Sequence, residues 1–462
     1  MRKLAFIFPL LFIFELIFGI SGTMIVVHGI AIRHILFILS FISLYGYVLF
    51  YILKNKKKIF SLQKDAFLGS FTKIDIGAVV FELSMILSMT VIPFIMGTSL
   101  RYAKSEVFDS AAIFSLFFAV SYLIKENQID VKKILSCLKV LVFLFAVYHL
   151  ILYFGQEMQT GFIEDVFKAF NELVGGNGLV PRIVLGHGGY TRVMFNTSIY
   201  LLIGFFIFFY EFKKNKWYDY LIFIVELLAM ITTVTKSIWF GTGIAFALAC
   251  AAYLAYGLKT DRRMAVKAVS LVIITGLTIV ISDKLIFNDI VYIRMSNAFV
   301  TTVDEDETEE SEDSDKEENR KKKAAKKLDE EGAAESNSIK IEQMGKLLEK
   351  WKGSPIIGYG YGSYVEGYLR SEVAPFSYEM QLFSLLMKIG ILGLIIWIGF
   401  FALQFIVMIK KKSHNLVHIF AWLFLLMALV VCVQTNPLLI SFTGMSVILF
   451  LSLISIDESN KF

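Results

Sequence analysis

The sequence predicts an all-α polytopic membrane protein with about twelve transmembrane helices and two large extracytoplasmic loops. Two observations support this prediction. Of the 462 residues, 56% are hydrophobic and the mean hydropathy is +0.67, which excludes a soluble globular domain of this length. The apolar residues also fall into stretches of about 20, the length that crosses a bilayer as a helix, separated by mostly short and charged connections.

The apolar stretches place the spans at residues 4–21, 34–53, 75–98, 107–124, 134–154, 193–212, 220–235, 237–258, 268–282, 379–409, 416–433 and 439–456. The first stretch has the basic start of a signal peptide but continues without a small-x-small cleavage pattern, so we expect a retained anchor. The three cysteines all fall inside predicted spans. This placement indicates neither a disulfide framework nor a metal site, and no cofactor is expected.

Lysine and arginine set the expected orientation. With a cytoplasmic N-terminus, every inner connection carries a basic cluster, at residues 54–73, 125–133, 213–216, 259–267 and 410–412. The short outer connections hold only Arg33, Arg101, Lys104 and Lys236. This asymmetry follows the positive-inside rule, so we expect a multi-pass protein of the cytoplasmic membrane with both termini cytoplasmic.

Two connections are too long to be turns, and both are expected outside the cell. The chain then divides into an N-terminal five-helix membrane region, a first large loop, a central four-helix region, a second large loop and a C-terminal three-helix region. Their bounds are residues 1–154, 155–192, 193–282, 283–378 and 379–462. We expect function in the two loops and in the span ends beside them.

The second loop contains a charged insert, residues 304–335, which is acidic first and mostly basic after. Such a sequence buries little apolar surface, so a solvated segment is the simpler interpretation and a mobile lid or docking surface the alternative. Apolar residues at helical spacing then predict an amphipathic helix over residues 339–352. That helix would lie on the outer membrane surface or pack on the outer ends of the spans.

The stretch GSPIIGYGYGSY, residues 353–364, follows this helix directly. Glycine lets backbone approach a bulky ligand closely, and tyrosine offers a flat face with a hydroxyl group, which together suit a sugar. Gly358, Tyr359, Gly360, Tyr361 and Gly362 are therefore candidate substrate-binding residues. A plain turn with tyrosines at the membrane interface is the alternative.

Four passages together resemble the O-antigen ligase and O-antigen polymerase superfamily of bacterial membrane glycan enzymes. They are PRIVLGHGGYTRVMFN (181–196), TVTKSIWF (233–240), the glycine-tyrosine stretch followed by the span beginning EMQLFSLLMKIG (379–390), and TNPLLISFTG (435–444). The resemblance covers roughly residues 180–450. It implies transfer of a polyprenyl-pyrophosphate-linked glycan to an acceptor hydroxyl on the outer side of the membrane.

The resemblance also implies residue roles. Family arginines around the pyrophosphate correspond to Arg182 or Arg192, and to Lys236. At Lys236 a point charge replaces the planar guanidinium that pairs bidentately with phosphate. Ligases of the family carry a His-Asn pair where this sequence has Ser377-Tyr378-Glu379, and this departure favours a polymerase.

The chemistry gives a parallel assignment. Cations must stabilise the negative charge that develops on the leaving diphosphate, and Arg182, Arg192, Lys236 and Arg294 are the basic residues near outer span ends. A base must accept the hydroxyl proton, and the candidates are Glu379, Glu366, Glu372 and His187. The alternatives are basic side chains that only reach the interface and carboxylates that are only solvated.

Charges within the predicted spans require a separate explanation, because an uncompensated charge there costs about 2.5–3.5 kcal/mol. They include Glu15, Glu82, Glu226 and Lys388, and we expect Glu226 to pair with Lys388. We also expect a polyprenyl-pyrophosphate-linked oligosaccharide and membrane lipid as partners, with a flippase and a chain-length regulator as candidates and no nucleic acid. An O-antigen-type ligase and a glycan or lipid exporter remain alternative functions, although the absence of an internal repeat disfavours the exporter.

Overall fold

The computed structural model describes residues 1–19, 25–59, 66–157, 165, 168–169, 172, 183–185, 190–297, 316–369, 371–410, 416–435 and 438–460. Two candidate site residues, Arg182 and His187, lie outside the described residues. The acidic part of the insert, residues 304–315, lies outside them as well.

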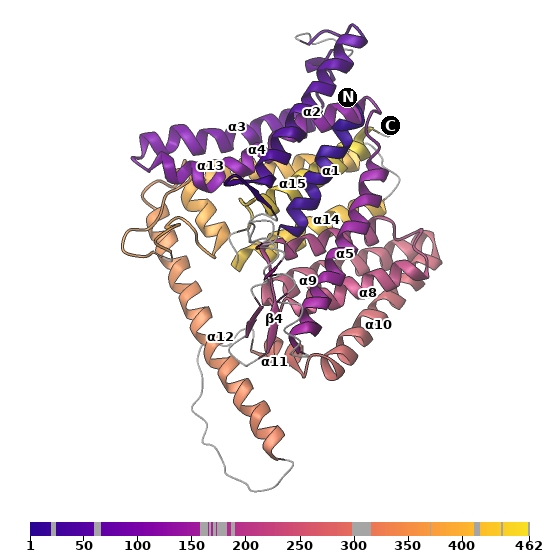
Figure 1. Ribbon diagram of the computed structural model, residues 1–462, viewed down its shortest axis with the longest axis vertical. Coiled ribbons are helices and arrows are strands. Elements are labelled where there is room, and N and C mark those ends of the chain that lie inside the picture. Colours follow the sequence, from indigo (N-terminus) through magenta and orange to yellow (C-terminus); the bar gives the residue numbers. More distant parts are fainter. Residues whose placement is uncertain are drawn as a thin grey trace.

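Helices form almost all of the regular structure (Figure 1). They are α1 (Leu4–Phe18), α2 (Ile32–Lys54), α3 (Lys73–Ile95), α4 (Leu100–Lys125), α5 (Val131–Glu157), α7 (Leu201–Tyr210), α8 (Trp217–Thr232), α9 (Lys236–Thr260), α10 (Arg262–Leu285), α11 (Ile290–Ser296), α12 (Lys316–Trp351), α13 (Gln381–Lys410), α14 (Leu416–Cys432) and α15 (Phe442–Asn460). Short 3-10 turns are η1 (Leu68–Ser70), η2 (Asn196–Tyr200) and η3 (Val433–Thr435). Two antiparallel hairpins pair β1 (Val26–Val27) with β2 (Ile30–Ala31), and β3 (Ile183–Leu185) with β4 (Thr191–Val193).

Each predicted span contains a helix, and the all-α polytopic membrane fold is confirmed. In the described part of the chain, eight helices are long and apolar enough to cross a membrane: α2, α3, α4, α5, α9, α10, α13 and α15. The helices α1, α7 with η2, and α14 are apolar but shorter, and α8 has 16 residues. The count of about twelve spans stays a prediction.

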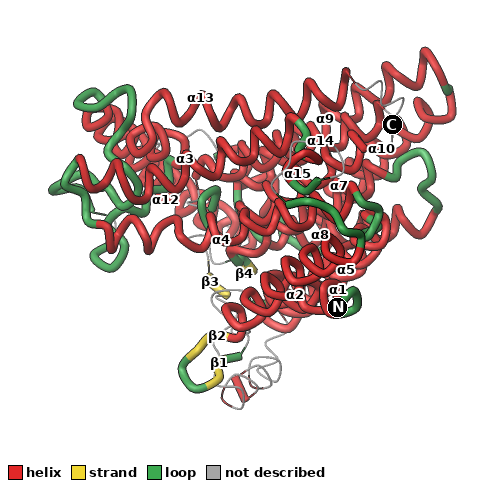
Figure 2. Tube along the Cα trace, turned by 90° about the horizontal axis from the view of Figure 1, so that it is seen from above, coloured by secondary structure: helices red, strands yellow, loops and turns green. Residues whose placement is uncertain are grey.

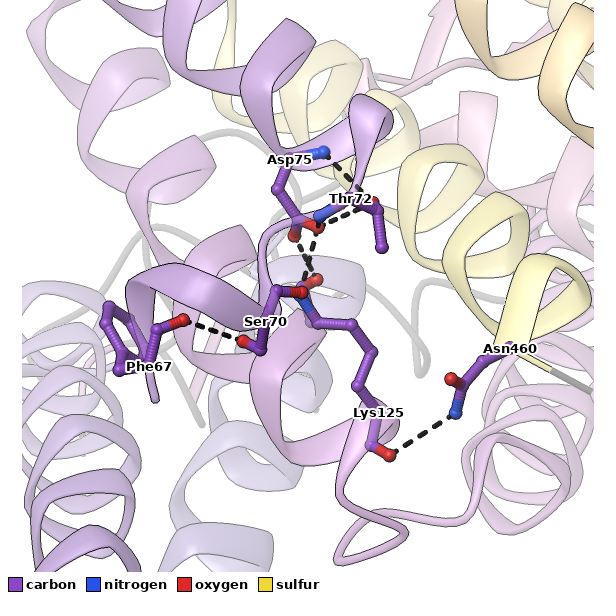
Figure 3. A network of polar contacts seen from close by, with 7 residues as sticks. Phe67, Ser70, Thr72, Asp75, Lys125 and Asn460 are labelled. Atoms are coloured by element: carbon purple, nitrogen blue, oxygen red, sulfur yellow. Dashed lines mark hydrogen bonds and ion pairs between the residues drawn. The ribbon is translucent and has the colours of Figure 1, made fainter. Parts of the chain in front are cut away.

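Polar contacts tie several lysine-bearing helix ends together at one end of the bundle, which we call the basic end. The Lys125 ammonium donates to Asp75 Oδ2 at 2.9 Å and to the Ser70 carbonyl at 3.0 Å, and Asn460 Nδ2 donates to the Lys125 carbonyl at 3.4 Å (Figure 3). This network joins the start of α3 to the ends of α4 and α15. Both chain termini lie in the same part of the molecule, at the upper right of Figure 1.

The opposite end of the bundle, which we call the site end, contains the starts of α4, α9, α13 and α15. The loop between α12 and α13 lies there, in orange at the left of Figure 1. The helices α3 and α13 run side by side toward it in both views (Figure 2). Consecutive spans therefore alternate in direction, as the spacing of the basic clusters predicts.

Helix α12 starts at Lys316, much earlier than the predicted 339. Its added part is rich in lysine, glutamate and alanine, which have high helix propensity, and opposite charges four residues apart stabilise such a helix. Of the predicted apolar face, Leu347 is fully buried against Tyr378 and Met387, whereas Ile341 is exposed. The helix thus packs on the site end of the bundle, the second of the two alternatives left by the sequence.

Helix α13 is broken at Gly390, whose backbone (φ +62°, ψ −172°) is not helical. The break leaves backbone groups without helical partners inside a predicted span, and such groups must be satisfied by other protein atoms. The glycine-tyrosine stretch supplies them. Tyr359 N donates to Met387 O at 3.1 Å and Gly360 N to Lys388 O at 2.8 Å, while Ile391 N and Leu392 N each donate back, to Pro355 O and Ile356 O, at 3.0 Å.

This docking corrects the sugar-binding interpretation of the glycines. A Cβ at Gly358 would lie 2.4 Å from Lys388 O, at Gly360 2.5 Å from the Pro93 ring, and at Gly362 2.3 Å from Ala103 N. All three have positive φ, so glycine is required both by conformation and by close approach to the protein's own helices. Tyr361 is fully buried and donates its backbone N–H to Ser88 O, so its ring cannot contact a sugar.

The predicted pair of Glu226 with Lys388 is wrong. Lys388 forms an ion pair with Glu106 of α4 and donates to the Phe376 carbonyl at 2.8 Å. Glu226 is buried where α8 meets α7, with its carboxylate 2.4 Å from the position that a Cβ on Gly204 would occupy. The prediction paired Glu226 with Lys388 because the two charges lie at a similar depth in their predicted spans. In the structure, the two side chains face different neighbours.

Candidate functional site

The candidate site is built around the turn Thr233–Lys236, which connects α8 to α9 at the site end. Val234 in this turn has φ +44°, in the left-handed region that a β-branched residue rarely adopts. Its side chain is buried, so the surrounding structure holds the turn in place. Strain of this kind costs about 1–3 kcal/mol and gathers at functional sites.

Arg192 reaches this turn from β4. Its Nε donates to the Thr233 carbonyl at 3.1 Å and its Nη2 to Thr235 Oγ1 at 3.2 Å. The Thr235 hydroxyl in turn donates to the Thr233 carbonyl at 2.8 Å. These contacts fix the guanidinium beside the first turn of α9 while the side chain stays half-buried.

Arg294 approaches the same turn from another element, and Lys236 is the last residue of the turn. Arg294, on α11, points Nη2 toward the Val234 carbonyl at 3.5 Å, and its guanidinium lies 5.5 Å from the centre of the Tyr190 ring. Lys236 is the first residue of α9 and donates to the Asn297 carbonyl at 2.8 Å. Both side chains are half-buried. We call Arg192, Lys236 and Arg294 the cation cluster.

The electrostatics of the cation cluster favour an anion. Burial lowers the pKa of Arg192 and the neighbouring charge of Arg294 lowers it further, while Tyr190 and Glu379 act in the opposite direction. Mutually repelling cations in a partly buried position gain from a negatively charged ligand between them. Helix α9 begins at the cluster and adds the partial positive charge of its N-terminus.

Glu379 is the candidate base that lies near these cations. It is half-buried just before α13, and its charge acts on Arg192. Glu366 and Glu372 are exposed, and the charge of Glu366 acts instead on Lys350 of α12. In the described part of the chain, no contact links either of them to the cation cluster. The structure therefore brings together Arg192, Lys236 and Arg294 from the predicted set, and the charge of Glu379 acts on Arg192.

Two carboxylates near the site were not predicted as site residues. Glu106 and Asp109 lie one turn apart on α4 and line a polar cavity that also contains Lys388. In the sequence, the signal for these two residues was a pair of acids three residues apart at the start of an apolar stretch. The predicted span began at 107 and so left Glu106 among the loop residues.

Residues 220–398 match the family model described as O-antigen ligase, Wzy_C. This segment of the chain is similar to the O-antigen ligase and polymerase superfamily. No curated protein and no solved structure matches the chain.

The matched O-antigen ligase segment includes Lys236, Arg294 and Glu379, whereas Arg192 precedes it and the acids of α4 lie well outside it. Members of this superfamily are membrane enzymes that process lipid-linked glycans. The resemblance to this superfamily is thus confirmed over residues 220–398, whereas the passages at 181–196 and 435–444 lie outside the matched segment.

Proposed function

We propose that the protein is a polysaccharide polymerase that transfers a polyprenyl-pyrophosphate-linked glycan onto a sugar hydroxyl of another repeat unit. The reaction would take place on the outer side of the cytoplasmic membrane. In the proposed orientation, the basic end of the bundle faces the cytoplasm and the site end faces out. The observation that supports this proposal is the convergence of Arg192, Lys236 and Arg294 on one strained turn.

In the proposed reaction, the acceptor hydroxyl oxygen forms a bond to the anomeric carbon of the donor. The bond from that carbon to the diphosphate oxygen breaks, and the polyprenyl diphosphate leaves with the electron pair. The cation cluster stabilises the charge that develops on the leaving diphosphate, and fixed donors of this kind contribute about 10²–10³ each in rate. Arg192 and Arg294 offer planar guanidinium groups for bidentate contacts, while Lys236 offers a point charge.

Glu379 is the proposed acceptor of the hydroxyl proton. Its charge acts on Arg192, and this electrostatic interaction supports the assignment. A carboxylate needs hydrogen-bond reach to the hydroxyl when both substrates are bound, and Glu379 lies two residues before the helix that lines the neighbouring polar cavity. The His-Asn pair of family ligases is absent at this position, which supports a polymerase over a ligase.

A complementation experiment tests this function. In a deletion strain, Arg192→Ala or Arg294→Ala should reach the membrane in normal amounts while surface polymer collapses to single repeats on a gel ladder. Arg101→Ala is the matched control, because Arg101 is an exposed arginine at the start of α4 away from the cluster. Full-length polymer from both cluster variants would remove them from the mechanism.

The lipid-linked intermediates of the deletion strain separate the two glycosyl-transfer functions. If the missing protein is a polymerase, single repeat units should remain on the carrier. If it is a ligase, finished polymer should remain on the carrier. An exporter predicts neither pattern, because it forms no glycosidic bond. A flippase and a chain-length regulator are the partners that the polymerase reaction would require.

A further inference from the structure

A polar cavity of about 230 Å³ opens at the site end between α4, α13 and α15. Its lining includes Ser377, Tyr378 and Gln381, which flank Glu379 in the segment that leads into α13. Drug-sized pockets measure about 300–1,000 Å³, so this cavity suits a single sugar ring better than a whole repeat unit. The cavity is therefore next to the proposed proton acceptor but distinct from the cation cluster.

One wall of the cavity is an ion pair that is already satisfied. Lys388 pairs with Glu106 and donates to the Phe376 carbonyl, and the other oxygen of Glu106 accepts the Gly362 N–H at 2.6 Å. Both side chains are buried or nearly so. This pair joins α4, α13 and the glycine-tyrosine stretch, and it fixes the shape of the cavity.

Asp109 lies one turn further along α4 and differs from Glu106 in its contacts. It is half-buried, lines the cavity, and forms no hydrogen bond or ion pair with any described residue. Arg33 and His34 at the start of α2 act on it only through electrostatics. An ionisable side chain within a predicted span is costly unless it faces water or a ligand, so Asp109 is a functional candidate.

The other cavity groups suit a saccharide. A carboxylate accepts hydrogen bonds from two adjacent hydroxyls, and an amide such as Gln381 both donates and accepts. Gln381 is fixed in place because its Oε1 accepts the Leu439 N–H at 3.4 Å, in the passage that opens the last span. Phe376 also lines the cavity and provides apolar surface for a sugar face.

We propose that this cavity binds the acceptor sugar, with Asp109 accepting hydrogen bonds from its hydroxyls. This proposal rests on the proposed glycosyl transfer and specifies its acceptor side. The donor diphosphate would lie on the cation cluster, and the acceptor sugar in the cavity would present its reacting hydroxyl toward Glu379. Two substrates would thus approach the segment before α13 from two sides.

The test uses the full chain in lipid nanodiscs, with the repeat-unit oligosaccharide released by mild acid from the host's own lipid-linked intermediate as the acceptor probe. At saturating lipid-linked donor, Asp109→Asn should raise the KM for this oligosaccharide about tenfold or more, as expected for loss of one charged hydrogen bond. The KM for donor should change less than threefold. Asp130→Asn, an exposed acid at the basic end, is the matched control and should change neither value.

A binding measurement that needs no turnover keeps the two proposals separate. Saturation-transfer NMR of the oligosaccharide should give a signal with the wild type and with Arg192→Ala, and a lost signal with Asp109→Asn. Wild-type binding without glycosidic bond formation would overturn the proposed function but support the cavity. An unchanged signal or acceptor KM in Asp109→Asn, or no signal with the wild type, would overturn the cavity assignment. Should Asp109→Asn fail to accumulate, Asp109→Glu keeps the charge, displaces the carboxylate and should show the same selective loss.

Discussion

Gly358→Ala tests whether the glycine-tyrosine stretch stabilises the broken helix α13. The new Cβ would lie 2.4 Å from Lys388 O and 2.6 Å from Gly390 N, where neither backbone group can move freely. An alanine at φ +70° costs about 1–2 kcal/mol in backbone strain alone. Displacing the stretch would also weaken its hydrogen bonds to α13, each of which costs about 1–3 kcal/mol when a buried partner is left unsatisfied.

The expected loss is therefore about 3 kcal/mol or more in the free energy of unfolding. Gly367→Ala is the matched control, because Gly367 has φ +74° but no atom within 4 Å of its would-be Cβ. Its loss should be only the strain of about 1–2 kcal/mol. Apparent melting temperatures of both variants in one detergent-lipid mixture, scanned at one rate, measure the difference. Equal melting temperatures for the two variants would refute the docking of the stretch on α13.

Three further predictions concern buried charges and the cation cluster. Lys388→Met should destabilise the protein by about 3–5 kcal/mol because it leaves Glu106 buried and unpaired. Adding Glu106→Gln should restore most of the melting temperature. Additive losses from the two substitutions would contradict this pairing. Lys236→Ala should lower the rate of glycan transfer about 10²–10³-fold, while Lys236→Arg should stay within tenfold of the wild type in the same assay; equal losses would exclude a role for its charge. Asp75→Asn should lower the melting temperature by weakening its charged contact with Lys125 (Figure 3), worth about 1.5–3 kcal/mol, and an unchanged value would show that the contact stabilises nothing.

The sequence predicted the helical framework well because span length and basic clusters are local signals. Each predicted span contains a helix. The start of α12 was misplaced by more than twenty residues. The charged insert was judged by its low apolar content, although its lysine, glutamate and alanine residues have high helix propensity.

The tertiary contacts were less predictable. Pairing Lys388 with Glu106 requires knowing that α4 packs near α13, and no spacing in the sequence reveals it. The glycines before α13 were correctly recognised as a site of close backbone approach, but the approaching group is the protein's own helix. In contrast, Arg192, Lys236 and Arg294 were predicted from charge at outer span ends, and the structure brings them to one turn.

The central claim is that the cation cluster holds a lipid diphosphate while its glycan is transferred. The most direct measurement incubates the purified protein with the host's lipid-linked repeat unit and follows both the glycan products and the released polyprenyl diphosphate. We predict that the wild type and Arg101→Ala form longer glycans with matching release of the diphosphate, and that the double variant Arg192→Ala, Arg294→Ala forms neither. Product formation by the double variant at the wild-type rate would contradict the claim, as would the absence of any glycosidic bond with the wild type.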